Sequence, residues 1–247
     1  MERIFIVTGA SGKLGASFIE NLKEKSNHVF ALARRQTETE ADITLAADLL
    51  DENQVEAIFN TINVSDATEI VLIHTVGKFK FESNDSIGTH KNEEGIDDEV
   101  YTTNVITTKN ILKQLLSNMK PQATVSVVAF ASVSDKHDIP FWSSYTRAKN
   151  ILRGYLQTLS EANQISALMV NVSTVDTGNE NLLRPNADKT YWLQPQEIVE
   201  RVLPELSTLN GYKEIDVVKE RPDFDEKYYI DHEALLGKWK REMDIKE

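Results

Sequence analysis

Three polar side chains near the middle of the chain have the types and spacing of an acid–base site. Tyr145 and Lys149 are four residues apart, and Ser132 lies thirteen residues before Tyr145. On a helix, residues four apart lie one turn apart on the same face. The ammonium of Lys149 favours phenolate over phenol, so we expect the pKa of Tyr145 to fall from about 10 toward the working pH. Tyr145 could then donate a proton to a carbonyl oxygen, or remove one from an alcohol, and a serine hydroxyl such as that of Ser132 is of the type that hydrogen-bonds such an oxygen.

A glycine-rich segment follows the first apolar run. It reads Thr8-Gly9-Ala10-Ser11-Gly12-Lys13-Leu14-Gly15, and it holds three of the 10 glycines of the chain. Glycines at a strand–helix junction allow a tight turn and let backbone N–H groups approach a pyrophosphate at the helix N-terminus. The spacing is G-x-x-G-x-x-G, which differs from the G-x-G-x-x-G of the standard fingerprint. The segment predicts a dinucleotide site, and the alternative is a flexible turn that binds nothing.

The residues after the second apolar run indicate which dinucleotide would bind. Folds that take NAD usually place an acid on the adenosine ribose about 20 residues after the glycines. Here the run ends Ala33-Arg34-Arg35-Gln36, with no acid before Glu38. Two guanidinium groups suit the 2′-phosphate of NADP, and Lys13 adds a third cation. We therefore predict NADP(H) in preference to NAD(H); the alternative is a pair of solvated arginines.

Apolar runs alternate with helical patterns along most of the chain. Strands are predicted at 3–7, 28–33, 43–47, 69–76, 124–131, 165–172 and 214–218, and helices at 13–25, 51–63, 99–119, 143–162 and 195–207. Continuous apolar runs are typical of parallel strands buried on both faces. The alternation predicts an α/β fold: a Rossmann-like, doubly wound, seven-stranded, mostly parallel sheet flanked by helices. We expect one domain over residues 1–218 and a charged tail over 219–247.

Length, charge and composition exclude several other classes of protein. The chain has 247 residues, a net charge of −12, five histidines without metal-ligand spacing, and no cysteine. Such a length buries a core without disulfides, and thiol chemistry is excluded. Binding to nucleic acid or anionic lipid requires basic clusters, which the acidic balance disfavours. No run reaches the length of a membrane span or signal peptide. We expect a soluble, cytoplasmic protein with no metal, nucleic-acid or membrane partner.

Taken together, these features resemble the short-chain dehydrogenase/reductase family over residues 3 to about 218. The residues that carry the resemblance are the glycine turn, Asn104, Ser132, Tyr145 and Lys149. The resemblance implies that the last four form a catalytic set, in which Lys149 also binds the nicotinamide ribose and Asn104 orders a water that links Lys149 to solvent. Hydride transfer belongs to the cofactor. Alternatively, Tyr145 is a tyrosine of the core and Ser132 a serine of a turn, but the joint occurrence of the motifs disfavours this interpretation.

The resemblance also implies cofactor contacts after several strands. Asp48-Leu49 matches a pair that contacts adenine, and Thr177 is the candidate contact to the nicotinamide carboxamide. The predicted cofactor-binding residues are Gly9, Ser11, Gly12, Lys13, Leu14, Gly15, Arg34, Arg35, Asp48, Leu49, Thr75, Gly77, Tyr145, Lys149 and Thr177.

Two loops depart from the family pattern. His74-Thr75-Val76-Gly77 stands where many members have Asn-Asn-Ala-Gly, and Val172-Ser173 replaces a Pro-Gly pair. These differences concern loop geometry more than chemistry. His74 is either a catalytic base or a hydrogen-bonded histidine at a strand end, and we favour the second interpretation.

The substrate side of the site is weakly specified. In this family the segment after the sixth strand covers the active site, here residues 178–194. Its apolar residues, and those just before Tyr145, either line an apolar pocket or pack the loop onto the body; they are Phe141, Trp142, Leu182, Leu183, Tyr191 and Trp192. Arg184 either meets an acidic substrate group or faces water. We interpret the charge-rich stretches 78–100 and 219–247 as solvated surface, although apolar spacing in the second allows a helix.

These observations predict an NADP-dependent enzyme that interconverts a carbonyl and an alcohol, with reduction of a small molecule as the expected direction. One alternative is a non-catalytic NADP(H)-binding regulator of the same fold. A less favoured one is a nucleotide-sugar epimerase or dehydratase, for which the residues after 218 are too few to form a substrate domain. By analogy with the family, we expect a homodimer or homotetramer that pairs the helices at 99–119 and 143–162.

Overall fold

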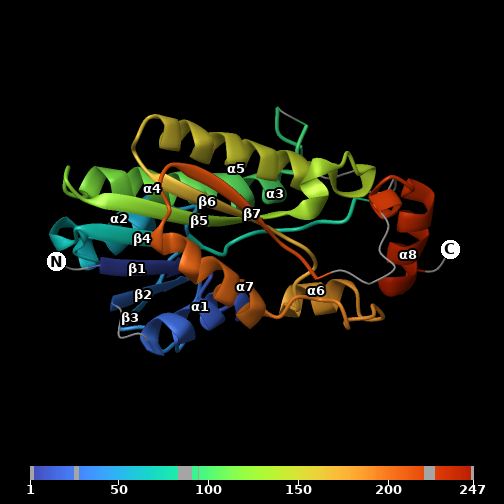
Figure 1. Cartoon of the computed structure of the whole chain (residues 1–247), viewed down its shortest axis with the longest axis horizontal. Helices are drawn as coiled ribbons and strands as arrows, with labels where there is room; N and C mark the ends of the chain where they lie inside the picture. Colours follow the sequence, from blue (N-terminus) through green and yellow to red (C-terminus); the bar gives the residue numbers. More distant parts are fainter. Residues whose placement is uncertain (1–2, 25–27, 83–90, 94, 220–225, 246–247) are drawn as a thin grey trace.

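The computed structural model describes residues 3–24, 28–82, 91–93, 95–219 and 226–245. Seven strands form one sheet in the order β3-β2-β1-β4-β5-β6-β7, and every neighbouring pair is parallel (Figure 1). The strands are β1 Arg3–Thr8, β2 His28–Ala33, β3 Ile43–Ala46, β4 Glu69–His74, β5 Thr124–Ser132, β6 Ser166–Val172 and β7 Tyr212–Val217. The predicted doubly wound sheet is confirmed, and it is parallel throughout.

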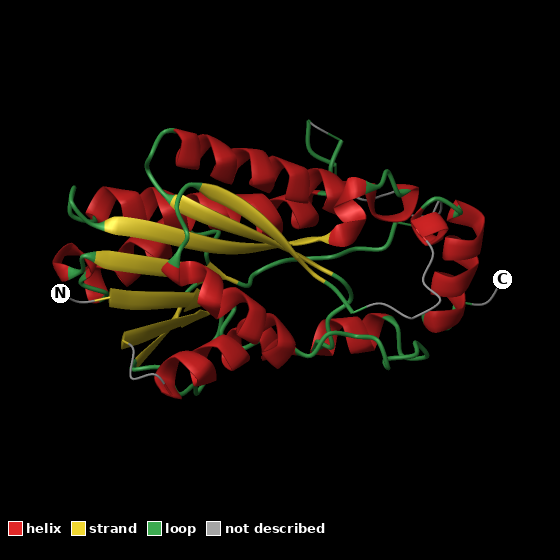
Figure 2. Cartoon of the chain, in the orientation of Figure 1, coloured by secondary structure: helices red, strands yellow, loops and turns green. Residues whose placement is uncertain are grey.

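Helices cover both faces of the sheet, which explains why the central strands are apolar on both sides (Figure 2). One core lies under α2 (Glu52–Thr61), α4 (Thr107–Asn118) and α5 (Ser143–Glu161). The other lies under α1 (Lys13–Glu24) and α7 (Pro195–Val202). In each helix, apolar residues three and four positions apart supply the buried face, such as Val55, Ile58 and Phe59 in α2.

The strand order places a crevice beside the end of β1. The chain moves outward from β1 to β2 and β3, and then returns to the other side of β1 with β4. Open parallel sheets bind ligands at the carboxyl ends of their strands where the order reverses in this way. The glycine turn leaves β1 at this point. It is tied to both neighbours, because Ala10 N donates to Leu32 O at 3.1 Å and Thr75 N donates to Thr8 O at 3.3 Å.

The helix predicted over 99–119 is interrupted. A short α3 (Asp98–Tyr101) leads into a π-helical segment, Thr102–Ile106, before α4 begins. The side chain of Asn104 offers a physical reason, because its Nδ2 donates to Val100 O at 2.8 Å. In a regular α-helix this carbonyl would accept from the backbone N–H of Asn104, so the side chain competes with the backbone for it. Single π-helical turns of this kind are frequent at functional sites.

The segments beyond the carboxyl ends of the strands carry the remaining helices. These are α6 (Gly178–Leu183) and α8 (His232–Glu242), together with short turns at Val133–Lys136, Pro140–Trp142 and Glu226–Tyr229. Two further turns, Val64–Asp66 and Leu203–Ser207, precede β4 and β7 at the amino ends of those strands. Figure 1 shows α6 and α8 at that end of the molecule. Among the described residues, no helix is both long enough and apolar enough to cross a membrane.

The interpretation of the two charge-rich stretches as solvated surface is wrong for their aromatic and apolar residues. Phe79 and Phe81 pack with Leu235, Trp239 and Met243 in a cluster that also includes Ile139 and Trp142. Aromatic and apolar side chains at helical spacing outweigh the surrounding charges, because the charged groups of α8 can face water while its apolar stripe is buried. Residues 83–90 and 94 of the first stretch, and 220–225 and 246–247 of the second, lie outside the described residues.

Candidate active site

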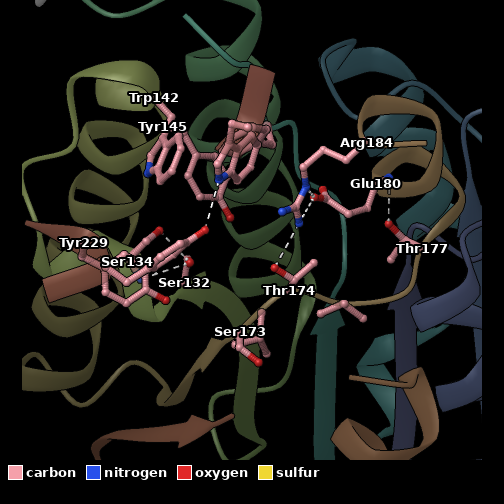
Figure 3. Close-up of a pocket in the computed structure, with 15 residues that line it drawn as sticks. Ser132, Ser134, Trp142, Tyr145, Ser173, Thr174, Thr177, Glu180, Arg184 and Tyr229 are labelled. Atoms are coloured by element: carbon pink, nitrogen blue, oxygen red, sulfur yellow. Dashed lines mark hydrogen bonds and ion pairs between the residues drawn. The ribbon is translucent and has the colours of Figure 1, made fainter. Parts of the chain in front are cut away.

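The fold brings Ser132, Tyr145 and Lys149 to one place. Ser132 ends β5, whereas Tyr145 and Lys149 lie on the first turns of α5. Ser132 and Tyr145 line the same pocket (Figure 3). Lys149 is buried behind Tyr145, with its Nζ 5.4 Å from the centre of the tyrosine ring. The Tyr145 hydroxyl forms no hydrogen bond to a described residue, so it is available to a ligand in the pocket.

The expected fall in the pKa of Tyr145 is wrong. Burial raises the pKa of Tyr145 well above 10, and the carboxylates of Asp135 and Glu180 raise it further. The ammonium of Lys149 lies over the ring, 5.4 Å from its centre, and does not offset the loss of water around the phenol. Tyr145 is therefore a neutral phenol at pH 7, which is the proton-donating form.

Burial has the opposite effect on the cation behind it. The pKa of Lys149 falls to about 8, chiefly because burial disfavours the ammonium, while Asp135 raises it and Arg153 lowers it. A lysine that titrates near neutral pH can exchange protons with its surroundings at a physiological pH.

Asn104 lies close to Lys149 in space, as the predicted set requires. A Cβ built on Gly77 would be 3.1 Å from Asn104 Oδ1 and 3.4 Å from Lys149 Nζ, so both atoms border the space that this glycine leaves open. Asn104 is fully buried, and its amide donates to Lys78 O at 2.7 Å. The oxygen also accepts from Lys78 N, at 3.3 Å. The loop after β4 thus holds Asn104 in a fixed orientation next to the lysine.

Two neighbours of Ser132 belong to the site and were not predicted. Ser134 lines the pocket, and its Oγ lies 2.8 Å from Ser132 Oγ. Asp135 accepts from Ser132 N at 2.9 Å, which closes a capping box over the turn Val133–Lys136. The spacing Ser132-x-x-Asp135 is a capping signature that the sequence displays.

Asp135 is also an unusual buried acid. Its side chain is fully buried, its Oδ1 has no hydrogen-bond partner among the described residues, and Arg153 is 3.9 Å from its Oδ2. Burial raises the pKa of Asp135 to about 6, although the Ser132 amide and the cations of Lys149 and Arg153 oppose the shift.

His74 is the hydrogen-bonded histidine that we favoured. It is buried at the end of β4, with Nδ1 2.9 Å from Thr8 Oγ1 and Nε2 3.3 Å from Thr107 Oγ1. Since the Thr107 hydroxyl donates to Thr103 O at 2.7 Å, it accepts from Nε2, and Nδ1 accepts from Thr8. Burial, with the nearby Lys149 charge, lowers the pKa of His74 to about 3. A neutral imidazole with both nitrogens engaged is not a base for the pocket.

The glycine turn has the close packing that a phosphate cradle needs. Gly9 has φ +73°, and a Cβ there would lie 2.5 Å from Thr75 Oγ1. A Cβ on Gly15 would lie 2.5 Å from Gly9 O and 2.9 Å from Gly9 C. Both positions exclude any side chain, and α1 begins at Lys13, with its first amides free of intrahelical partners. The turn therefore fits a dinucleotide phosphate on the N-terminus of α1.

The three cations predicted to bind the 2′-phosphate of NADP(H) do not all point toward the same place. Arg34 and Arg35 are exposed directly after β2, and neither forms an ion pair with a described residue. Lys13 turns instead toward the loop after β6, where its Nζ lies 3.2 Å from Asp176. Beside the turn is a cavity of about 350 Å³ that also bears three carboxylates; its lining is Ala10, Ala16, Ile19, Glu20, Glu38, Thr39 and Glu40.

The other predicted cofactor contacts lie at the carboxyl ends of their strands. Asp48 caps a turn after β3 by accepting from Leu50 N at 3.0 Å, and Leu49 is buried beside it. Thr75 donates to Thr8 O at 2.7 Å. Thr177 lines the pocket and caps α6, where its Oγ1 accepts from Glu180 N.

The pocket around Ser132 and Tyr145 has a volume of about 200 Å³ and takes much of its wall from the end of the chain. Tyr228, Tyr229 and Trp239 line it from beyond residue 218. Of the aromatics considered before Tyr145, Trp142 lines the pocket, whereas Phe141 stacks against Phe81 with ring centres 6.0 Å apart. For the part of the wall that lies beyond residue 218, the one signal in the sequence is the apolar helical spacing within 219–247, to which Trp239 belongs.

Arg184 neither faces water nor is free for an acidic group. Its side chain is 4% exposed, and its guanidinium pairs with Glu180 of α6 and, at 3.0 Å, with Glu242 of α8. It also donates to Thr174 Oγ1 at 3.1 Å and lies 4.2 Å from the ring centre of Trp239. Arg184 therefore connects the segment after β6 to the C-terminal helix.

The chain matches a known protein family. The profile of the short chain dehydrogenase family matches residues 3–187. The match covers most of the chain, including Asn104, Ser132, Tyr145 and Lys149. The chain belongs to the short chain dehydrogenase family, a family of oxidoreductases. A comparison with curated proteins finds no significant match.

Solved structures share the fold at low sequence identity. Ligand-free aldohexose dehydrogenase of Thermoplasma acidophilum has a TM-score of 0.72 and 20% identity, with 91% of this chain and 97% of that chain covered. A 4-hydroxyisoleucine dehydrogenase complexed with NADH gives 0.70 and 18%, with 91% and 100% covered. A variant of actinorhodin polyketide ketoreductase with NADPH gives 0.69 and 18%, with 90% and 98% covered.

Proposed function

We propose that the protein is an NADPH-dependent reductase that converts a small carbonyl compound to an alcohol. One observation carries the proposal: the Tyr145 hydroxyl lines a pocket beside Ser132, forms no hydrogen bond to another described residue, and has the Lys149 ammonium behind its ring. A protein that only binds a dinucleotide has no need of this arrangement.

The chain's own residues supply the proton and the orientation of the substrate. Ser132 donates a hydrogen bond to the carbonyl oxygen and holds it beside Tyr145. When bound, the reduced nicotinamide supplies a hydride to the carbonyl carbon. The O–H bond of Tyr145 breaks as its proton passes to the carbonyl oxygen, and the neighbouring Lys149 ammonium stabilises the resulting phenolate. Lys149 also holds the nicotinamide ribose, and Asn104 orders a water through which Lys149 and Tyr145 regain the proton from solvent.

The choice of NADP(H) is part of the proposal. It is supported by the exposed Arg34 and Arg35 at the end of β2, next to the glycine turn. Glu38 lies in the cavity beside that turn and is the residue that would favour the ribose hydroxyl of NAD(H) instead. The other proposed contacts to the dinucleotide come from the glycine turn and from Asp48, Leu49, Thr75, Gly77 and Thr177. Among the solved structures of similar fold, one is described with NADH and another with NADPH.

The decisive experiment is Tyr145→Phe, assayed against a panel of ketones and aldehydes by the loss of NADPH absorbance. Removal of the proton donor is expected to lower kcat by about 10² to 10⁴-fold while NADPH still binds. Tyr155→Phe is the matched control, because Tyr155 lies on the same helix and does not line the pocket. Full activity of Tyr145→Phe, or no turnover of any carbonyl by the unaltered protein, would contradict the proposal and favour the regulator.

We also propose that the protein is a homodimer or homotetramer that pairs α4 and α5 between copies. This rests on the analogy with the family, and light scattering that shows a stable monomer would contradict it.

A further inference from the structure

The active-site pocket has an aromatic wall assembled from three distant parts of the chain. Phe79 comes from the loop after β4, Trp142 and Tyr145 from the start of α5, and Tyr228, Tyr229 and Trp239 from the C-terminal segment. Trp142 and Trp239 have ring centres 4.7 Å apart, and Phe79 lies 5.2 Å from Tyr145 and 5.5 Å from Trp239. Rings at these separations form a continuous surface whose preferred partner is another ring.

The charged groups at this wall are already satisfied. Arg184 is paired with the carboxylates of Glu180 and Glu242, which outnumber it. A substrate carboxylate or phosphate would have to displace one of these acids and lose its own hydration, because Arg184 is the one cation among the described residues that line the pocket. The pocket therefore selects against anionic substrates.

One polar group of the wall is unsatisfied. Trp142 is 2% exposed, and its Nε1 has no hydrogen-bond partner among the described residues. In contrast, Trp239 Nε1 donates to Tyr228 Oη at 3.3 Å. A buried donor without a partner is uncommon. Because solvent does not reach this N–H through the pocket, it offers no contact to a ligand, and Trp142 contributes to the wall through its ring.

The size of the pocket limits the ligand further. Its volume is about 200 Å³. A protein cavity of about 150 Å³ holds one benzene molecule. Thr177, the proposed contact to the nicotinamide carboxamide, lines the same pocket, so the cofactor shares this space and leaves room for no more than one ring beside the aromatic wall. A short carbonyl substituent on that ring would reach Ser132 and Tyr145.

We propose that the substrates are uncharged, single-ring aromatic ketones or aldehydes, recognised by the aromatic wall that Trp239 completes. The inference rests on the proposed reductase function, which supplies the reaction: the carbonyl is reduced to an alcohol, the cofactor is oxidised, and the proton comes from Tyr145.

The test compares three ketones with the purified full-length protein and NADPH. Acetophenone is the aromatic probe, cyclohexyl methyl ketone has the same skeleton without the ring electrons, and 4-acetylbenzoate adds a negative charge. We expect kcat/KM for acetophenone to exceed that for cyclohexyl methyl ketone by about tenfold, the effect of one or two ring contacts. We expect 4-acetylbenzoate to be poorer by about 10²-fold, because its carboxylate finds no partner. Equal or reversed preferences would overturn the proposal.

Variants assign the preference to the wall. Trp239→Leu should abolish the preference for acetophenone over cyclohexyl methyl ketone, and Trp239→Phe should retain part of it. Trp192→Leu is the matched control, because Trp192 contacts the same Arg184 at 5.0 Å but does not line the pocket. Its preference should match that of the unaltered protein. A preference that survives in Trp239→Leu, or disappears equally in Trp192→Leu, would overturn the assignment.

Binding separates this inference from the proposed function. The two uncharged ketones are titrated in the absence of NADPH, and binding is followed by calorimetry. Tighter binding of acetophenone without any turnover would support the aromatic pocket while contradicting the reductase. Turnover of aliphatic ketones without tighter binding of acetophenone would support the reductase function and contradict the aromatic pocket.

Discussion

The glycine turn and the aromatic wall of the pocket are built in opposite ways. The turn is made by eight consecutive residues, and backbone contacts hold it against β2 and β4. The wall is made by side chains from residues 79 to 239, and Arg184 holds α8, which carries Trp239, to the segment after β6 through Glu242 and Glu180. We therefore expect cofactor binding at the turn to depend on backbone geometry, and substrate selection at the wall to depend on side chains that the fold brings together.

The largest effect is expected from Gly15→Ala in the turn. The new Cβ would lie 2.5 Å from Gly9 O, and backbone atoms must move to admit it. We expect a loss of about 3 kcal/mol in the free energy of unfolding, together with weaker NADPH binding. Urea denaturation and a titration with NADPH measure both effects.

Gly154→Ala is the control for this change. A Cβ there meets nothing within 4 Å, and alanine favours the helix, so a gain of about 1 kcal/mol is expected. Equal stability of the two variants would show that the turn does not depend on its close backbone packing.

Next in size is the effect of Asp135→Asn, which tests the buried acid beside Ser132. The folded pKa of Asp135 is about 6, above its ordinary value of 3.8, so the folded state binds more protons between these two pH values. The free energy of unfolding therefore falls as pH rises from about 4 to 6 and then levels off. Asparagine does not ionise, so the variant does not show this fall in the free energy of unfolding.

Thermal or urea unfolding from pH 4 to pH 8 measures this difference. We expect the variant to gain about 2 kcal/mol relative to the unaltered protein between pH 4 and pH 7. A constant difference between the two proteins at every pH would contradict the raised pKa.

A smaller effect is expected when Arg34 and Arg35 are both replaced by serine. Loss of two guanidinium groups near the 2′-phosphate should raise the KM for NADPH by about tenfold and leave that for NADH nearly unchanged. Kinetics with both cofactors provide the measurement. A parallel change for NADPH and NADH would instead indicate that the arginines do not read the phosphate.

The smallest effect is expected for Glu242→Gln in α8. Arg184 keeps Glu180 and Thr174, so only one of its ion pairs is lost. We expect a loss of about 1 kcal/mol in stability. The KM for acetophenone should rise, because α8 carries Trp239, while the KM for NADPH stays constant. Lys240→Gln, a charge change elsewhere on α8, is the control. A rise in the KM for NADPH would mean that the two regions are not separable.

Much of this protein could be predicted from its sequence. The seven strands and most helices follow from apolar runs and helical spacing, because these patterns are local consequences of burial in a parallel sheet. The turn from Gly9 to Gly15 and the pair Tyr145–Lys149 are also local, since a tight turn and one helical turn bring their members together without help from the rest of the chain.

Other features were decided only by the tertiary structure. The pKa of Tyr145 moves opposite to the expectation because burial, which depends on the whole pocket, outweighs the nearby lysine. Arg184 connects α6 to α8 because it pairs with two acids that are 62 positions apart in the sequence, Glu180 and Glu242. Trp239 entered the pocket because α8 folds back across the strand ends. Desolvation and contacts between distant residues are properties of the folded chain, and no local pattern specifies them.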